Sequence, residues 1–307
     1  MNLRRLRDGV FAFIAVFAVS GEAAHLSHMP VADAAHELTD ISGTITRAST
    51  AIATNIAAVR TKESGSYLGF DTNIYPGDNA MRAWRHTGSP YEWVGYYLPA
   101  PCHRDDSWSG KRETLTNMGW GIAVLYVGQQ AWGGVGGKGS RSSKSSLAGC
   151  SSQLVTGAQG RADGIDAVAR AAAEGFGRGT TLYLDVERME TIPSGMRDYY
   201  REWTAQVLAD GRFLPGIYSH SHNAVQIYAD VREVYAHAGV AGEPPFWIAG
   251  KTKEFTRSKT PEQVGHAFAD VWQGKLDIVE TRNGVRLPID VSVASVPSPS
   301  EEYALAN

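Results

Sequence analysis

The chain has 307 residues, of which 43% are hydrophobic and 20% are charged, a composition typical of a globular protein with an ample core and not of a disordered chain. Its formal net charge is -3, and no long basic or acidic run dominates the sequence. No uniform field therefore draws the protein to nucleic acid or to anionic lipid, and neither partner is expected.

The N-terminus has the three parts of a secretory signal peptide. Arg4, Arg5 and Arg7 precede an apolar run at residues 10–19, and small residues follow it. We predict a signal peptide at residues 1–24 and an exported protein that is secreted or associated with the cell wall. The apolar run is shorter than the roughly 20 residues that span a bilayer, so no integral membrane span is expected after signal removal. An uncleaved amphipathic helix is the alternative, and the export route stays open.

Two segments flank the predicted domain. Residues 25–66 are rich in Ala, Thr and Ser and are predicted to be a linker, with a helix as an option at residues 44–60. Residues 297–307 contain two prolines and two glutamates and are predicted to be a flexible tail. The mature protein is expected to be a monomer.

Between these segments, short apolar runs alternate with amphipathic stretches. Eight such runs in about 230 residues predict a single α/β domain, a (β/α)8 TIM barrel at residues 67–296. A doubly wound sheet for nucleotides is disfavoured, because no G-x-G-x-x-G follows the first strand. The glycines gather instead at residues 128–149, which are predicted to be a loop. The predicted strands are residues 67–71, 93–98, 121–127, 182–186, 214–218, 246–249, 269–273 and 287–291; the predicted helices are residues 80–86, 111–118, 162–174, 196–209, 224–238 and 261–266.

Cys102 and Cys150 are the only cysteines of the chain. In an oxidising compartment an even pair of cysteines is typically bridged. Cys102 follows the second predicted strand and Cys150 precedes the third predicted helix, so their loops are expected to be neighbours on one rim of the barrel. We predict a Cys102–Cys150 disulfide.

The fourth predicted strand carries two carboxylates. Side chains alternate along a strand, so Asp185 and Glu187 share one face with Tyr183. Their repulsion and partial desolvation would raise one pKa and leave a protonated acid beside an ionised partner, a pair that glycosidic bond cleavage uses. Glu187 is expected nearest the mouth, with a pKa above about 4.3. The structural alternative is that Asp185 ends the strand as a turn residue and Glu187 pairs with Arg188.

A TIM barrel places its chemistry at the carboxyl ends of its strands. The acids there are predicted to be catalytic, and the other residues to bind sugar, because aromatic faces stack on sugar rings and amides bind hydroxyl groups. Taken singly, Tyr126 and Trp272 fit core packing better. The candidate catalytic residues are Asp71, Asp185, Glu187 and Asp290, and the candidate substrate-binding residues are Tyr97, Tyr126, Tyr218, Trp272 and Gln273.

Seven short segments in this order and spacing resemble the family 25 glycoside hydrolases, muramidases that cleave peptidoglycan. They are residues 69–71, 95–97, 183–187, 216–219, 246–249, 271–273 and 288–290. Residues 70–71, 119–120 and 126–128 are similar to a secreted glycoside-hydrolase-like domain of unknown function related to that family. The resemblance implies that Glu187 is the acid, that Asp185 is its partner, and that Asp71 and Asp290 are the other carboxylates of the site. It implies peptidoglycan or a related polysaccharide as the substrate, and no cofactor is expected.

The chemistry leaves alternatives open. Glu187 would protonate the glycosidic oxygen while Asp185 stabilises the oxocarbenium-like centre or activates water; a 2-acetamido group of the substrate is another nucleophile. A different class of function is a non-catalytic glycan-binding domain that uses the same rim. A metal-dependent barrel phosphodiesterase is the third hypothesis, with His220, His222 and His103 as ligands. Zinc sites usually need three protein ligands and the spacing offers only a pair, so no metal is expected.

Overall fold

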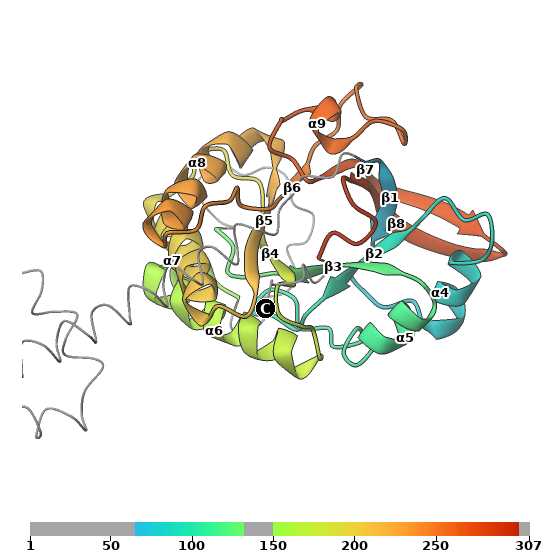
Figure 1. Cartoon of the computed structure of the whole chain (residues 1–307), viewed down its shortest axis with the longest axis horizontal. Helices are drawn as coiled ribbons and strands as arrows, with labels where there is room; N and C mark the ends of the chain where they lie inside the picture. Colours follow the sequence, from blue (N-terminus) through green and yellow to red (C-terminus); the bar gives the residue numbers. More distant parts are fainter. Residues whose placement is uncertain (1–64, 132–149, 301–307) are drawn as a thin grey trace, which may run out of the picture. The chain divides into compact units, whose positions relative to one another are not determined.

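The computed structural model describes residues 65–131 and 150–300 of the chain. The predicted signal peptide, the linker up to residue 64, the loop at 132–149 and the chain end at 301–307 lie outside the described residues. In the described part, strands β1 to β8 close into a barrel in sequence order (Figure 1). The prediction of an α/β TIM barrel is confirmed.

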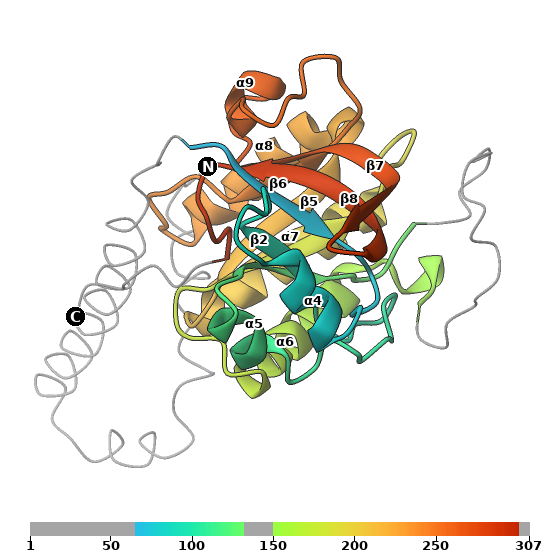
Figure 2. The ribbon, with the colours of Figure 1, turned by 90° about the vertical axis from the view of Figure 1, so that its right-hand side faces the viewer.

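Every strand and helix that the sequence predicts within these ranges is present, but α6 begins five residues earlier than predicted, and β7 and β8 are longer than predicted. Helices α6 (Gly157–Ala173), α7 (Ser194–Asp210) and α8 (Ser221–His237) pack side by side along one flank of the barrel (Figures 1 and 2). None of the helices in these two ranges is both long and apolar enough to cross a membrane. The elements are β1 Tyr67–Asp71, α4 Asp78–Trp84, β2 Trp93–Tyr97, α5 Arg112–Asn117, β3 Gly121–Tyr126, η1 Ser152–Leu154, α6 Gly157–Ala173, β4 Thr181–Val186, α7 Ser194–Asp210, β5 Leu214–His220, α8 Ser221–His237, β6 Phe246–Ala249, α9 Pro261–Val264, β7 Val271–Arg282 and β8 Val285–Ala294.

Alternate strand residues build two cores. One face of the strands packs against the helices, and the other fills the barrel with large side chains. Inside the barrel, the ring of Trp247 makes edge contacts with Trp93 and Tyr183 at centroid distances of 5.4 and 5.8 Å. All three side chains are buried. They close the barrel with a packed aromatic floor, so the polar site lies above it at the carboxyl ends of the parallel strands.

The last strand differs from the regular βα unit that the sequence predicted. β7 is parallel to β6, but β8 is antiparallel to both β7 and β1. β7 and β8 continue beyond the barrel as a hairpin, which packs beside α4 where the indole Nε1 of Trp84 donates to the carbonyl of Val285 at 3.1 Å (Figure 1). A hairpin, and not a helix, therefore joins β7 to β8. The two residues between these strands, Asn283 and Gly284, have φ of 45° and 78° and form the hairpin turn, and this Asn-Gly pair is the local signal that the sequence analysis missed.

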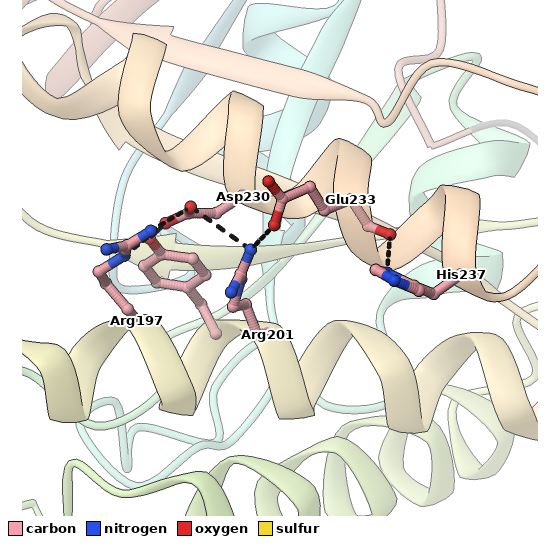
Figure 3. A network of polar contacts seen from close by, with 6 residues as sticks. Arg197, Arg201, Asp230, Glu233 and His237 are labelled. Carbon is pink, nitrogen blue, oxygen red and sulfur yellow. Dashed lines mark hydrogen bonds and ion pairs between the residues drawn. The ribbon is translucent and has the colours of Figure 1, made fainter. Parts of the chain in front are cut away.

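A network of charged side chains joins α7 to α8 (Figure 3). Asp230 of α8 is only 4% exposed, and it accepts hydrogen bonds from Arg197 Nε at 2.9 Å and Nη2 at 2.6 Å. The hydroxyl of Tyr200 also donates to Asp230, and Arg201 pairs with both Asp230 and Glu233. Bidentate pairing satisfies the buried carboxylate. The two helices that flank β5 in the sequence are thereby held together.

The predicted flexible tail, 297–307, begins too early. The hydroxyl of Ser298 accepts from the Ile122 backbone N–H at 3.0 Å, and that of Ser300 accepts from the Val124 N–H at 2.8 Å. Ser300 is buried. Residues 297–300 therefore pack against β3 at the end of the barrel opposite the site, where their hydroxyl groups satisfy backbone donors that composition alone does not reveal.

The predicted disulfide between Cys102 and Cys150 is confirmed, with the two Cα atoms 4.9 Å apart and a sequence separation of 48. The backbone N–H of Cys102 also donates to the carbonyl of Val127 at 3.1 Å. The loop after β2 is therefore tied to the chain that follows β3.

Candidate active site

Asp71 ends β1 and points into the open end of the barrel. Its Oδ2 accepts a hydrogen bond from the Tyr97 hydroxyl at 2.8 Å, and its Oδ1 accepts one from Gln273 Nε2 at 2.7 Å. The Tyr218 hydroxyl donates to Gln273 Oε1 at 2.7 Å, which turns the amide so that its NH2 group faces Asp71. Three of the predicted substrate-binding residues, Tyr97, Tyr218 and Gln273, therefore orient a carboxyl group.

A glycine makes the space for Asp71. A Cβ atom at Gly95 on β2 would lie 2.6 Å from the Cβ of Asp71. Asp71 is 6% exposed. Burial and the charge of Asp290 raise its pKa to about 7, although the hydrogen bonds from Tyr97 and Gln273 act in the opposite direction. Asp71 therefore keeps its proton to a higher pH than an exposed aspartate does.

Asp185 near the end of β4 and Glu187 just after β4 lie at different depths. Asp185 is 8% exposed, and within the described residues its Oδ1 has no hydrogen-bond partner. Burial, the charge of Glu187 and that of Asp71 raise the pKa of Asp185 well above its ordinary value. Glu187 is exposed, which confirms that it is nearest the mouth. The pKa of Glu187 is also raised, because the walls of the mouth remove part of the hydration of its carboxyl and Asp290 adds a negative charge, against the effect of the Arg188 N–H.

Asp290 reaches the same mouth from β8. It lies in register with Asp71 across the antiparallel β1–β8 pair. The sequence analysis predicted Asp290 at the carboxyl end of its strand, but it lies where β8 enters the barrel. Its Oδ1 accepts from the Asp277 backbone N–H at 2.6 Å. Asp277 has a φ of 55° at an irregular point of β7. The pKa of Asp290 is raised overall, mainly by burial and also by the charge of Asp277. The hydrogen bond from the Asp277 N–H and the charge of Lys251 act in the opposite direction.

The acids from β1, β4 and β8 form one electrostatic group. Asp290 raises the pKa of Asp71 and of Glu187, while Asp71 and Glu187 raise that of Asp185. Like charges at close range cannot all ionise near neutral pH. The group therefore retains protons in a mouth that also contains carboxylates, which is the combination that general acid catalysis requires.

Sequence reasoning missed Gln130, a buried glutamine that follows β3. Its Nε2 donates to the Asp185 carbonyl at 2.8 Å, and its Oε1 accepts from the Glu187 N–H at 3.1 Å. The side-chain amide thus takes the place of a neighbouring strand beyond the end of β3. Its only sequence signal was a glutamine at the start of the glycine-rich stretch that was predicted to be a loop.

Asn223 was missed as well. Its Oδ1 accepts from the Met189 N–H at 3.0 Å, and its Nδ2 donates to the Met189 carbonyl at 3.0 Å. The Asn223 side chain is almost fully buried at the start of α8. The chain that follows Glu187 is thereby fixed to α8.

Two predicted substrate-binding residues lie elsewhere, which corrects the prediction. Tyr126 packs between β3 and the helices, and its hydroxyl donates to Asp166 of α6 at 2.9 Å. Trp272 also belongs to the outer core, and its Nε1 donates to the Gly250 carbonyl at 3.0 Å. Both residues are buried and lie on the strand face opposite the barrel interior, so neither can contact a ligand in the mouth.

The histidines considered as metal ligands are already engaged. His103 stacks on Tyr97 with ring centroids 4.8 Å apart and contacts the Asn73 carbonyl at 2.8 Å. His220 Nδ1 accepts from the His222 backbone N–H at 3.0 Å. Across residues 65–131 and 150–300, no three His, Cys, Asp or Glu side chains are grouped so as to hold a metal ion.

Comparison with known proteins gives a family and a fold. No curated protein matches the sequence. Among solved structures, the spore cortex lytic enzyme SleM of Clostridium perfringens has a TM-score of 0.50 at 12% identity and covers 75% of this chain and 67% of its own. GHIP of Streptococcus pneumoniae, a glycosyl hydrolase 25, has a TM-score of 0.47 at 12% identity over 81% of this chain and 92% of its own. The Tat-secreted protein Rv2525c of Mycobacterium tuberculosis has a TM-score of 0.42 at 18% identity over 74% of this chain and 94% of its own.

The likeness to SleM supports the barrel fold. The sequence profile of the Rv2525c-like, glycoside hydrolase-like domain matches residues 82–294, which is more than half of the chain. The relationship that the short segments predicted is therefore confirmed, and the chain belongs to the family of Rv2525c-like, glycoside hydrolase-like domains.

Proposed function

We propose that this protein is an exported glycoside hydrolase that cleaves peptidoglycan or a related cell-wall polysaccharide. The observation that carries the proposal is the meeting of Asp71, Asp185, Glu187 and Asp290 in one mouth, where each has a raised pKa. The family match and the name of SleM, a spore cortex lytic enzyme, support a wall glycan as the substrate class.

Glu187 is the proposed general acid. It is exposed at the mouth, where a glycosidic oxygen can reach it, and its raised pKa keeps its proton available. Transfer of that proton to the glycosidic oxygen lets the bond to the anomeric carbon break as positive charge develops on the sugar ring. Gln130 holds the Glu187 backbone during this step.

Asp185 is the proposed partner of the acid. Its Oδ1 is buried and has no hydrogen-bond partner among the described side chains and backbone groups, and a buried polar atom is stabilised once it acquires a partner. A substrate N–H group would supply a donor to Oδ1, and this hydrogen bond together with the positive charge of the sugar ring would favour the ionised form of Asp185 against the effect of burial. The carboxylate would in turn stabilise the positive ring. Water attacks that ring directly, or Asp185 or the 2-acetamido carbonyl attacks it first and water then hydrolyses the covalent intermediate. In the acetamido case, Asp71, fixed by Tyr97 and Gln273, steadies the acetamido group.

Two other functions make different predictions. A non-catalytic glycan-binding domain would use the same mouth to bind wall polysaccharide without cleaving it. A metal-dependent phosphodiesterase would need a ligand group, and the described ranges assemble none. The raised pKa values favour the hydrolase, because binding sugar hydroxyl groups does not require carboxyl groups that retain protons.

The test is to incubate the purified protein with a panel of peptidoglycan, chitin oligomers and other wall polysaccharides. New reducing ends, identified by mass spectrometry, would support the hydrolase. Binding of the same glycans with no new reducing ends would support the binding domain. Cleavage of phosphodiester substrates that a chelator abolishes would support the metal-dependent alternative and contradict our proposal.

A further inference from the structure

His220 is the last residue of β5, at the same end of the barrel as the acids. Along β5, Gly216 and Tyr218 face the barrel interior: a Cβ at Gly216 would touch the Tyr183 ring at 2.8 Å, and the Tyr218 hydroxyl reaches Gln273. His220 is the next residue on that face and the last residue of β5. Asp185 pairs with Tyr218 in the β4–β5 register, so His220 is level with Glu187, two residues further along each strand.

A hydrogen bond fixes the protonation state of His220. Its Nδ1 accepts from the His222 backbone N–H at 3.0 Å and caps the N-terminus of α8. A ring nitrogen that accepts a hydrogen bond carries no proton, so the neutral imidazole has its proton on Nε2. Burial and the positive charges of Arg188 and His222 lower the pKa of His220, which also favours the neutral ring.

The Nε2–H group is left as a donor. Within the described residues, the only hydrogen bond of the His220 side chain is the one that Nδ1 accepts, and the ring is half-buried. Nε2 lies on the ring edge away from that bond. The capping of α8 therefore gives a role to Nδ1 of His220 but none to Nε2.

A neutral donor suits this position. A charged histidine at this position would favour the ionised form of Glu187 and lower its pKa, which would remove the proton that a general acid needs. A neutral imidazole can donate a hydrogen bond without that effect. The negative mouth also disfavours an anionic ligand, so the acceptor that fits is an uncharged oxygen.

We propose that His220 is a substrate-positioning residue whose Nε2–H donates a hydrogen bond to a hydroxyl or acetamide oxygen of the glycan bound beside Glu187. This inference rests on the proposed function, because it assumes that a glycan occupies the mouth. It goes further by naming the donor, its tautomer and the class of atom that it binds.

His220→Asn separates this role from helix capping. Asn is among the best N-cap residues, so the variant keeps an acceptor for the His222 N–H, but it has no group at the position of Nε2. We expect an unchanged melting temperature, and about 3- to 10-fold weaker binding of N-acetylglucosamine oligomers and soluble glycan strands by calorimetry. If the glycan is cleaved, KM should rise by a similar factor while kcat stays within about twofold. His237→Asn, at the far end of α8, is the matched control and should bind as the natural protein does.

Nitrogen NMR of the histidine side chains adds a readout independent of turnover. The free protein should show His220 neutral with the proton on Nε2, and glycan should shift the Nε2–H signal. Equal glycan affinity in the natural protein and in His220→Asn, or a proton on Nδ1, would overturn the inference and leave the proposed function intact. Failure of the natural protein to bind any glycan of the panel would overturn the proposed function, and the inference with it.

Discussion

The side chain of Gln130 binds the backbone on both sides of Val186: its Oε1 accepts a hydrogen bond from the Glu187 N–H at 3.1 Å, and its Nε2 donates one to the Asp185 carbonyl at 2.8 Å. β3 ends at Tyr126, so no strand backbone is available to β4 at this level on that side. One buried amide therefore sets the position of the two acids on which the proposed chemistry depends.

Gln130→Ala should damage both stability and activity. The substitution leaves a backbone carbonyl and a backbone N–H without partners at a buried site, which costs about 1–3 kcal/mol of unfolding free energy. Turnover should fall by more than the loss of folded protein explains, because Glu187 is no longer held. Chemical denaturation and initial rates measure the two effects. Gln153→Ala, at an exposed position of η1, is the control and should change neither.

Asp71 should contribute more to the stability of the folded state at acid pH than at alkaline pH. The folded pKa of Asp71 is about 7, above its usual 3.8, so between those values the folded state binds a proton that the unfolded chain does not. The stability that Asp71 contributes is fully present below its usual pKa and is lost as the pH rises through its folded pKa. The unfolding free energy then falls by up to about 1.4 kcal/mol per pH unit. Asp71→Asn should flatten this dependence between pH 4 and 7, as measured by denaturation; identical slopes would contradict the raised pKa.

The disulfide should stabilise the folded state. Replacing Cys102 and Cys150 together with serine should lower the unfolding free energy by up to about 4 kcal/mol, from the entropy of the loop that the bond closes. A reducing agent should have the same effect on the natural protein and none on the double variant. If the variant and the oxidised natural protein unfold at the same denaturant concentration, the bond contributes nothing to stability.

Asp290 should set the alkaline limit of activity. Its charge helps to raise the pKa of Glu187, and activity should fall as pH rises through that pKa, because the general acid loses its proton. Asp290→Asn removes the charge and should shift the alkaline limb of the kcat profile to lower pH. Glu113→Gln, at an exposed position of α5, should leave the profile unchanged. A limb that does not move in Asp290→Asn would show that the two carboxyls are not coupled.

The sequence predicts the barrel and its acids well, because alternating apolar residues and strand ends are local signals. The rule that side chains alternate correctly places Asp185 and Glu187 on one face, since Tyr183 supplies the reference. To place a side chain, this rule needs one residue of the same strand that is known to face the barrel interior. Tyr126 and Trp272 were assigned to the rim from the end of the strand alone, and each lies one residue away from the inward face.

The reversed direction of β8 had a local signal that the sequence analysis missed: Asn283 and Gly284, with φ of 45° and 78°, form the two-residue turn between β7 and β8, and Asn-Gly is typical of such turns. Other features depend on contacts between distant segments. Gln130 and Asn223 act on backbone groups that lie 57 and 34 residues away. A single polar residue in a loop or at a helix start does not reveal such a partner.

The central claim is that the proton of Glu187 cleaves the glycosidic bond, and comparison of the natural protein with Glu187→Gln tests it most directly. Gln keeps the size of the side chain but has no proton of suitable acidity. On the glycan that yields the most reducing ends, kcat should fall by about 10²- to 10⁴-fold, while glycan binding is retained. Glu190→Gln, three residues further along and exposed, should retain full activity. Equal release of reducing ends by the natural protein and by Glu187→Gln would contradict the account.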